Sequence, residues 1–452
     1  MLWRKVSRSV RDVPQRELNI GAGTAIGFAI RIGGYLLAAL TGIVVARALG
    51  PHSRGVYSLV TTTAITYASS SELGLSPAGV YVVGQKQSTL PKVLGNNFAW
   101  LLAVGSLWTA ANLAAATFRP AWLPASVETQ HYLIFAAAGV AACALAIVKD
   151  GLLAAGSILA FGLVDFLEPF FRCLLIVTAV VVLGVGINGV LLGWSLAIAL
   201  ALLVALRLLA QRTHLTVRFD RPTFRKQLGF GFRGYLGWLL QSANYRLDVF
   251  LVAAFVGHTE LGFYAVAFGL AEMLWQIPFA LGTVFFPKVA AMDADENAEV
   301  AAVTCRRALF ITLIPTLGAL LAGRFLIELA YGSEFSPSVI SFYILAPSAL
   351  LYTVHRVLSS ALAARGMPES TLYGGLASVP ITLGLGLFLI PRWGIEGAAL
   401  TSMAAYAANA VCITAIFSAV TGKPVHDIML INRLDLRWSL QTARTFLARS
   451  DA

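Results

Sequence analysis

The chain has 452 residues, of which 58% are hydrophobic and 12% are charged, and its formal net charge is +11. Soluble domains average about 45–50% apolar and about 25% charged residues, so this composition excludes an ordinary soluble enzyme or binding domain. Lipid is therefore the expected surrounding of most of the chain. A backbone in lipid must satisfy its hydrogen bonds within helices or a closed barrel, and the long apolar runs favour helices.

Twelve apolar stretches of near-spanning length follow one another along the chain. The first six are 20–46, 55–83, 98–117, 132–148, 162–185 and 190–209, and the second six are 234–255, 262–286, 308–323, 339–364, 372–390 and 397–420. The second stretch is longer than a span needs and contains Gly74-Leu-Ser-Pro77, which predicts a break there. We therefore predict an all-α integral membrane protein with about 12 transmembrane helices.

Basic residues are distributed unevenly between the two predicted sides of the membrane. If the N-terminus is cytoplasmic, most of the 33 lysines and arginines fall on the cytoplasmic side. The basic residues of the outer loops are Arg47, Arg54, Arg119, Arg324 and Arg392. Because basic loops are retained in the cytoplasm, we expect both termini there. This placement explains the basic excess, so no nucleic-acid partner is expected.

The span order divides the chain into segments. We expect a basic cytoplasmic N-terminus (1–19), an N-lobe of six spans (20–209), a basic cytoplasmic linker (210–233), a C-lobe of six spans (234–420) and a cytoplasmic tail (421–452). The tail mixes apolar and basic residues, as does the linker, and both are typical of helices that lie on a membrane surface.

An internal repeat relates the two predicted lobes. Gly50-Pro-His-Ser-Arg-Gly55-Val-Tyr57 recurs 207 residues later as Gly257-His-Thr-Glu-Leu-Gly262-Phe-Tyr264. Gly186-Ile-Asn-Gly189 recurs 208 residues later as Gly394-Ile-Glu-Gly397. Because each half holds six spans, both halves have the same orientation in the membrane. The sequence thus predicts a parallel repeat about an axis along the membrane normal, with a central cavity suited to alternating access.

Several charged residues lie inside the predicted spans. A charge at the bilayer centre costs about 2.5–3.5 kcal/mol on insertion scales, so such residues usually face the interior of a helix bundle. We expect Arg31, Arg246 and Asp248, in the matching first and seventh spans, to face the cavity. The other charged candidates are Glu72, Asp165, Glu168, Arg172, Glu272 and Arg356. Arg31 has no acid in its own helix, which makes it the best single candidate to bind an anion such as phosphate.

The alternative is that these charges only pair with one another and fix helix packing. Glu168 and Arg172 have the i, i+4 spacing of an ion pair within one helix. Asp165 lies near the cytoplasmic end of the same span, and Arg356 can reach the interface by extending its side chain. The sequence leaves both interpretations open.

The chain lacks a Gly-rich phosphate-binding loop of the Walker type, so we expect no ATP hydrolysis within it. The longest predicted outer loop, 118–131, leaves little room for a catalytic site. We therefore expect a transporter and not an enzyme, without a cofactor or a metal. The alternatives are a cation-coupled multidrug antiporter, a membrane glycan polymerase or ligase, and a non-transporting scaffold for glycan assembly.

Three of these segments together resemble a known family. Arg47-Ala-Leu-Gly-Pro51 with Gly55-Val-Tyr57, Asn244-Tyr-Arg246-Leu-Asp248 and Gly394-Ile-Glu-Gly-Ala-Ala399 are similar to polysaccharide-repeat flippases of the multidrug/oligosaccharidyl-lipid/polysaccharide exporter superfamily. The resemblance implies two six-helix lobes that translocate a polyprenyl-diphosphate-linked oligosaccharide across the inner membrane of a bacterium or archaeon. Peptidoglycan-precursor flippases of this superfamily usually carry two further helices, so twelve spans favour an exopolysaccharide or O-antigen unit.

The resemblance also implies that the basic cavity residues of the family correspond to Arg31 and Arg246 and its embedded acids to Asp248 and Glu272. The other charges inside the predicted spans complete the candidate site. We expect Arg31, Arg246, Asp248, Arg172 and Arg356 to line the substrate cavity. Glu72, Asp248 and Glu272 are the candidates for coupling to an H⁺ or Na⁺ gradient. The expected partners are the lipid-linked glycan, membrane lipid, and glycan polymerases or glycosyltransferases of the same biosynthetic route.

Overall fold

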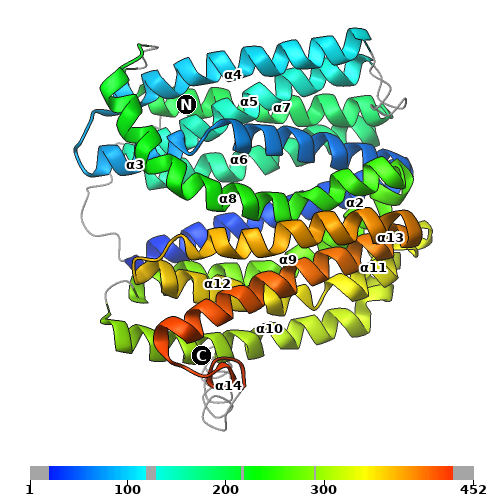
Figure 1. Ribbon diagram of the computed structural model, residues 1–452. Coiled ribbons are helices and arrows are strands. Elements are labelled where there is room, and N and C mark those ends of the chain that lie inside the picture. Colours follow the sequence, from blue (N-terminus) through cyan, green and yellow to red (C-terminus); the bar gives the residue numbers. More distant parts are fainter. Residues whose placement is uncertain (1–19, 119–128, 215–217, 290–291, 431–452) are drawn as a thin grey trace, which may run out of the picture.

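The computed structural model describes residues 20–118, 129–214, 218–289 and 292–430, and these residues form helices that run side by side, with no strand among them (Figure 1). The helices of the first half are α2 (Ile20–Ser71), α3 (Leu75–Gly84), α4 (Leu90–Phe118), α5 (Thr129–Ala154), α6 (Ile158–Val177), the π-helical η1 (Thr178–Val182) and α7 (Ile187–Ala210). Those of the second half are α8 (Arg221–Phe255), α9 (His258–Val289), α10 (Ala294–Tyr331), the 3₁₀ helix η2 (Ser333–Phe335), α11 (Ser338–Leu345), α12 (Ser348–Ala364), α13 (Ser370–Thr421) and α14 (Val425–Met429). The predicted all-helical class is confirmed.

Within these residues, 8 helical segments are long and apolar enough to cross a membrane. Two of these segments lie in α2 and α13 and each contains a glycine with a non-helical backbone, Gly50 with φ 74° and Gly394 with φ 57°. Each therefore holds two of the predicted spans joined at a sharp turn. The exact number of twelve crossings and the cytoplasmic placement of the termini stay predictions.

Two predicted spans are broken. The expected break near Gly74 is confirmed, because α2 ends at Ser71 and Gly74 adopts a left-handed φ of 72° before α3 begins. The second break, in stretch 339–364, was not expected from the sequence. There Pro347 separates α11 from α12, since proline has no backbone N–H to continue a helical ladder.

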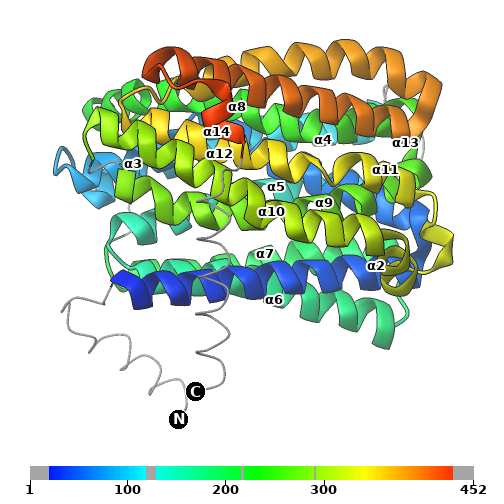
Figure 2. The same cartoon turned by 90° about the horizontal axis from the view of Figure 1, so that it is seen from below.

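The buried apolar residues form separate cores in the two halves of the chain. One core is built from residues between 45 and 209 and includes Trp194, which is 1% exposed. The other cores are built almost entirely from residues after 248. In Figure 1, α4 to α7 lie in the upper half of the molecule and α9 to α14 in the lower half, with α2 and α8 between them; Figure 2 shows the same helices from below. We keep the names N-lobe and C-lobe for residues 20–209 and 234–420.

Most of the predicted linker 210–233 forms the first turns of α8, which continues into the predicted seventh span. Asp220 caps this helix, and its carboxylate accepts a hydrogen bond from the backbone N–H of Thr223 at 3.1 Å. Pro222 follows in the first turn, where a missing N–H costs nothing. These three residues are a helix-start signal, and they begin α8 before the predicted seventh span.

The beginning of α8 docks on the N-lobe through buried polar groups. The Gln227 side chain is fully buried, donates to the Asn97 side chain at 2.9 Å and accepts from the Asn96 side chain at 3.1 Å. A Cβ on Gly231 would lie 2.4 Å from the carbonyl oxygen of Gly74, so the backbones of α8 and α3 touch there. Further along, α8 packs against α13 of the C-lobe. This one helix therefore joins the two lobes.

Candidate functional site

The two repeated turns lie directly against each other where α2 meets α9. A Cβ on Gly55 would lie 1.7 Å from the carbonyl oxygen of His258, and a Cβ on Gly262 would lie 1.9 Å from the carbonyl oxygen of Pro51. The same shift of 207 residues that pairs Gly55 with Gly262 pairs Pro51 with His258. A reciprocal contact of this kind is what an axis of two-fold pseudo-symmetry between α2 and α9 produces. It joins the lobes at the predicted outer side.

A tyrosine follows each of these glycines by two residues. In the N-lobe, Tyr57 of α2 lies beside Arg172 of α6 and interacts with it electrostatically. Arg172 also pairs with Glu168 of its own helix at 3.6 Å, as their spacing predicts. The Arg172 side chain is 17% exposed. One of the predicted cavity arginines is thus paired with an acid of its own helix.

In the C-lobe, Tyr264 of α9 donates a hydrogen bond to the carboxylate of Asp248 of α8. Ser402 of α13 donates to the same carboxylate oxygen at 2.9 Å, and the N–H of Val249 donates to the other oxygen at 2.8 Å. Asp248 is 0% exposed. The structure therefore places Asp248 inside the C-lobe and not on an accessible surface. For this reason we do not propose that Asp248 contacts the substrate.

Helix geometry accounts for this difference between Asp248 and Arg246. Two residues that are two positions apart on a helix do not face the same side. Arg246 instead points to a partly exposed side of α8, where it pairs with Glu272 of α9 at 3.3 Å. The Arg246 side chain is 32% exposed and that of Glu272 is 36% exposed. The Arg246 guanidinium also lies 5.7 Å from the centroid of the Phe268 ring.

Arg356 of α12 lies across the surface of α9. Its guanidinium is 4.8 Å from the centroid of the Phe279 ring, a cation–π distance. Gly282 allows this approach, because a Cβ there would lie 2.8 Å from Cγ of Arg356. The Arg356 Nε atom is buried and has no hydrogen-bond partner among the described residues. Arg356 and Arg246 thus lie on two C-lobe helices, α12 and α8, that both pack against α9 and α13.

The other predicted residues lie elsewhere. Arg31 falls on α2, but its side chain lies outside the part of the chain that the structure describes, so its role stays a prediction. Glu72 follows the last turn of α2 and interacts electrostatically with Asp150 of α5. Asp165 forms an ion pair with Lys149. These groups belong to the N-lobe and lie apart from the Arg246–Glu272 pair.

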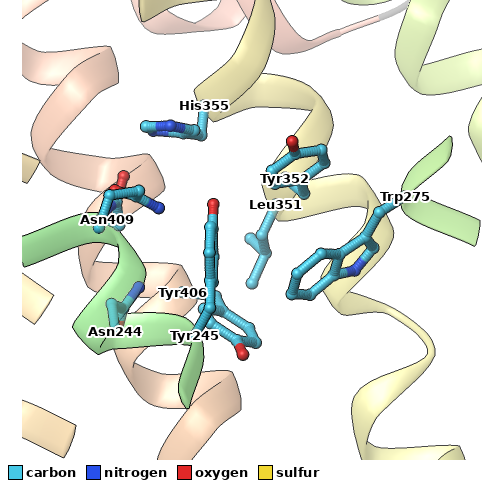
Figure 3. Close-up of a pocket in the computed structure, with 9 residues that line it drawn as sticks. Asn244, Tyr245, Trp275, Leu351, Tyr352, His355, Tyr406 and Asn409 are labelled. Atoms are coloured by element: carbon cyan, nitrogen blue, oxygen red, sulfur yellow. The ribbon is translucent and has the colours of Figure 1, made fainter. Parts of the chain in front are cut away.

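Next to the Arg246–Glu272 pair the C-lobe contains an aromatic cavity that the sequence analysis missed (Figure 3). We call it the aromatic cage. Its lining residues are Gln241, Asn244, Tyr245, Trp275, Leu351, Tyr352, His355, Tyr406 and Asn409. The sequence held one indication of this cavity: Tyr245 directly precedes Arg246, and His355 directly precedes Arg356.

Comparisons with known proteins place the chain in a family. The model of a family described as polysaccharide biosynthesis protein matches residues 44–340. A probable low-salt glycan biosynthesis flippase, Agl15, of Haloferax volcanii is 24% identical over 169 residues, which is 36% of each chain. The probable flippase AglR of the same organism is 26% identical over 199 residues, or 42% of each chain. The chain thus spans about two-fifths of the length of these curated relatives.

Solved structures show the same fold. An inward closed structure of the lipid II flippase MurJ has a TM-score of 0.72 at 12% identity and covers 90% of this chain and 88% of its own. An inward-facing multidrug resistance transporter of the MATE family and MOP superfamily has a TM-score of 0.70 at 15% identity, covering 88% of this chain and 99% of its own. An outward-facing structure with the same family description has a TM-score of 0.61, with 15% identity and coverage of 89% and 97%. The chain therefore shares the fold of these solved membrane transporters.

Proposed function

The chain belongs to the polysaccharide biosynthesis protein family, and from this membership we propose that it is a flippase for a lipid-linked glycan. The substrate we propose is an oligosaccharide attached to a polyprenyl diphosphate, carried across the cytoplasmic membrane by alternating access. Two relatives are described as probable flippases, and the chain shares its fold with a lipid II flippase; both findings support this assignment. Multidrug transporters have the same fold. The choice between the two functions therefore depends on the residues of the site.

The observation that carries the proposal is the Arg246–Glu272 pair. Both residues lie in the interior of long helices, yet each side chain is about one-third exposed. A structural ion pair inside lipid is better stabilised when it is sealed from the surroundings. Partial exposure instead leaves the guanidinium able to exchange its carboxylate partner for a ligand. A diphosphate suits this exchange, since arginine binds phosphate oxygens through two parallel hydrogen bonds.

Arg356 provides a second cation in the same lobe. Its Nε donor lacks a hydrogen-bond partner within the described residues and its charge rests on an aromatic ring. A buried donor without a partner costs free energy, so an added acceptor stabilises it. We propose that the two phosphates of the substrate engage Arg246 and Arg356, with Arg31 and Arg172 as further cavity cations. Glu272 then becomes free to take up a coupling cation when phosphate displaces it.

The contact between the repeated turns indicates which side is closed. Gly55 and Gly262 hold the backbones of α2 and α9 together at the predicted outer side. The higher TM-scores with inward structures than with the outward-facing structure support the same assignment. We therefore propose that the conformation described here is one step of alternating access, with the outer route shut.

The test uses a strain that lacks the gene and is complemented with single variants. We expect Arg246→Ala to reduce surface polysaccharide at least tenfold, because the diphosphate loses a bidentate contact worth about 1.5–3 kcal/mol. Arg246→Lys should retain part of the activity, since the charge persists without the planar fork. Full export by Arg246→Ala at normal membrane levels contradicts the proposed site.

A matched control comes from another ion pair. Arg324 pairs with Glu328 at 2.8 Å, but its side chain is 73% exposed, two turns before the end of α10. Arg324→Ala removes the same type of side chain from an exposed pair, and such pairs contribute little to stability. We expect this variant to export normally. A multidrug antiporter would show the reverse pattern in a drug-resistance assay, with loss of resistance in the Arg246 variants and unchanged polysaccharide.

A further inference from the structure

The aromatic cage is built to bind a small uncharged polar group. Trp275 and Tyr352 stack with ring centroids 5.0 Å apart, and Tyr245 and Tyr406 stand against them at 5.2 and 5.3 Å from Trp275. Figure 3 shows these rings surrounding a space that Asn244, His355 and Asn409 also face. No carboxylate, lysine or arginine is among the described residues that line it. The lining therefore suits neither a metal ion nor a phosphate.

Four buried polar atoms of the cage lack hydrogen-bond partners among the described residues, and Nδ1 of His355 and Oδ1 of Asn409 are two of them. The other two belong to Tyr406 and Asn244. The hydroxyl of Tyr406 and the Nδ2 atom of Asn244 lack hydrogen bonds within the described part of the chain, although these residues are only 5% and 0% exposed. Buried polar groups are almost always hydrogen-bonded, and each one left unpaired costs about 1–3 kcal/mol. A hydroxyl acts as both donor and acceptor and Nδ2 acts as a donor. A guest that carries hydroxyl or amide groups satisfies both atoms.

The size of the cage restricts the guest. The cavity volume is about 10 Å³, which is room for one group as small as a hydroxyl. Tyr245, Tyr352 and Gln241 are half-buried and not sealed, so one edge of the cage is accessible. A whole sugar ring does not fit inside, but a ring that rests on the exposed aromatic edge can place one substituent in the cavity. Aromatic surfaces with a few fixed polar atoms are suited to such mixed polar and apolar ligands.

The neighbours of the cage indicate which part of the substrate reaches it. Tyr245 precedes Arg246 in α8, and His355 precedes Arg356 in α12, so the cage borders the two cations assigned to the diphosphate. In a lipid-linked glycan the first sugar is bonded directly to that diphosphate. We propose that the aromatic cage recognises the sugar next to the diphosphate by taking one of its polar substituents. This inference rests on the proposed flippase function and adds a specificity site to it.

The test measures the binding of three radiolabelled lipids to the full chain in nanodiscs. The lipids are undecaprenyl diphosphate, the same lipid with one hexose, and the same lipid with one N-acetylhexosamine. We expect at least one sugar-bearing lipid to bind about tenfold more tightly than the bare diphosphate, the gain of roughly one well-placed hydrogen bond to a buried group. Equal affinity for all three lipids overturns the inference and indicates a cavity that holds only water.

Variants separate recognition from folding. Tyr406→Phe removes a hydroxyl that has no partner in the free protein, so we expect an unchanged melting temperature together with loss of most of the sugar-dependent gain. Asn244→Leu should also abolish the gain, and bare diphosphate should bind both variants as it binds the native chain. The control is Asn112→Leu, which replaces a buried asparagine of α4 that bonds within its own helix and should leave the gain intact. A gain that survives Tyr406→Phe contradicts the role of the cage.

The same binding data distinguish a failure of the cage inference from a failure of the proposed flippase function. If bare diphosphate binds and Arg246→Ala weakens it while the sugar adds nothing, only the cage inference fails. If none of the three lipids binds, the proposed function and the inference fail together.

Discussion

Tyr57 in the N-lobe and Tyr264 in the C-lobe occupy the same position in the repeat, but they bind side chains of opposite charge. Tyr57 lies beside the guanidinium of Arg172, whereas Tyr264 donates a hydrogen bond to the carboxylate of Asp248. The arginine has an ion-pair partner, Glu168, in its own helix, while the aspartate is fully buried and accepts three hydrogen bonds. The repeat thus fixes the glycine turn and the tyrosine, and the two lobes have diverged in the charge attached to that scaffold.

The glycines that the lobes share should be the least replaceable part of this scaffold. Gly55→Ala and Gly262→Ala each place a Cβ less than 2 Å from a carbonyl oxygen of the other lobe. We expect the backbones of α2 and α9 to move apart at a cost of about 1–3 kcal/mol or more, and glycan translocation to fall at least tenfold because the outer side no longer closes. Translocation in proteoliposomes is the measurement.

Gly269 supplies the control in the same helix. A Cβ there has no described atom within 4 Å, and alanine is the better helix former. Gly269→Ala should therefore translocate at the native rate. Equal loss in Gly269→Ala and Gly262→Ala would show that α9 tolerates no change at all and would remove the argument for a symmetric seal.

The two tyrosines should differ in what their hydroxyls contribute. Tyr264→Phe leaves a buried carboxylate short of one donor, which costs about 1.5–3 kcal/mol for a hydrogen bond to a charged group. Tyr57→Phe leaves Arg172 with its Glu168 partner, so we expect a smaller fall in melting temperature. The measurement is thermal unfolding of the purified variants in one detergent.

A double-mutant cycle sharpens this comparison. When Asp248→Asn removes the charge, the Tyr264 hydroxyl has less to stabilise, so Tyr264→Phe should cost less in that background. Equal costs in both backgrounds, or a larger cost for Tyr57→Phe than for Tyr264→Phe, contradict the assignment of the charged partners.

The features that depend on one short segment of sequence could be predicted, whereas those that depend on which helices pack together could not. The echo of Gly50 at Gly257 indicated the repeat, and both glycines adopt a left-handed φ, 74° and 99°. The ion-pair partner of Arg246 could not be predicted from sequence spacing, because Glu272 lies on another helix. The separate faces of Arg246 and Asp248 were accessible to reasoning, since residues two apart on a helix diverge. The aromatic cage requires four helices, α8, α9, α12 and α13, to meet, which no single stretch of sequence shows.

The junction between the lobes should give the smallest effect. Hydrogen bonds from Thr223 hold the pKa of Asp220 below its usual range. A carboxyl whose pKa is lower in the folded state stabilises the fold above its unfolded pKa, and this contribution is lost as the pH falls through the folded pKa. Asp220→Ala should lower the melting temperature slightly at neutral pH, and the difference from the native chain should shrink in acid. A difference that grows on acidification contradicts the cap.

The most direct test of the central claim removes both charges of the Arg246–Glu272 pair at once. In the double variant Arg246→Gln with Glu272→Gln, no unpaired charge remains, so a pair that only fixes helix packing is replaced by neutral groups of similar length. Reconstituted translocation of a polyprenyl-diphosphate-linked sugar is measured beside the melting temperature. We predict a melting temperature close to that of the native chain together with loss of translocation, and native translocation by this double variant would contradict a diphosphate-binding role for Arg246.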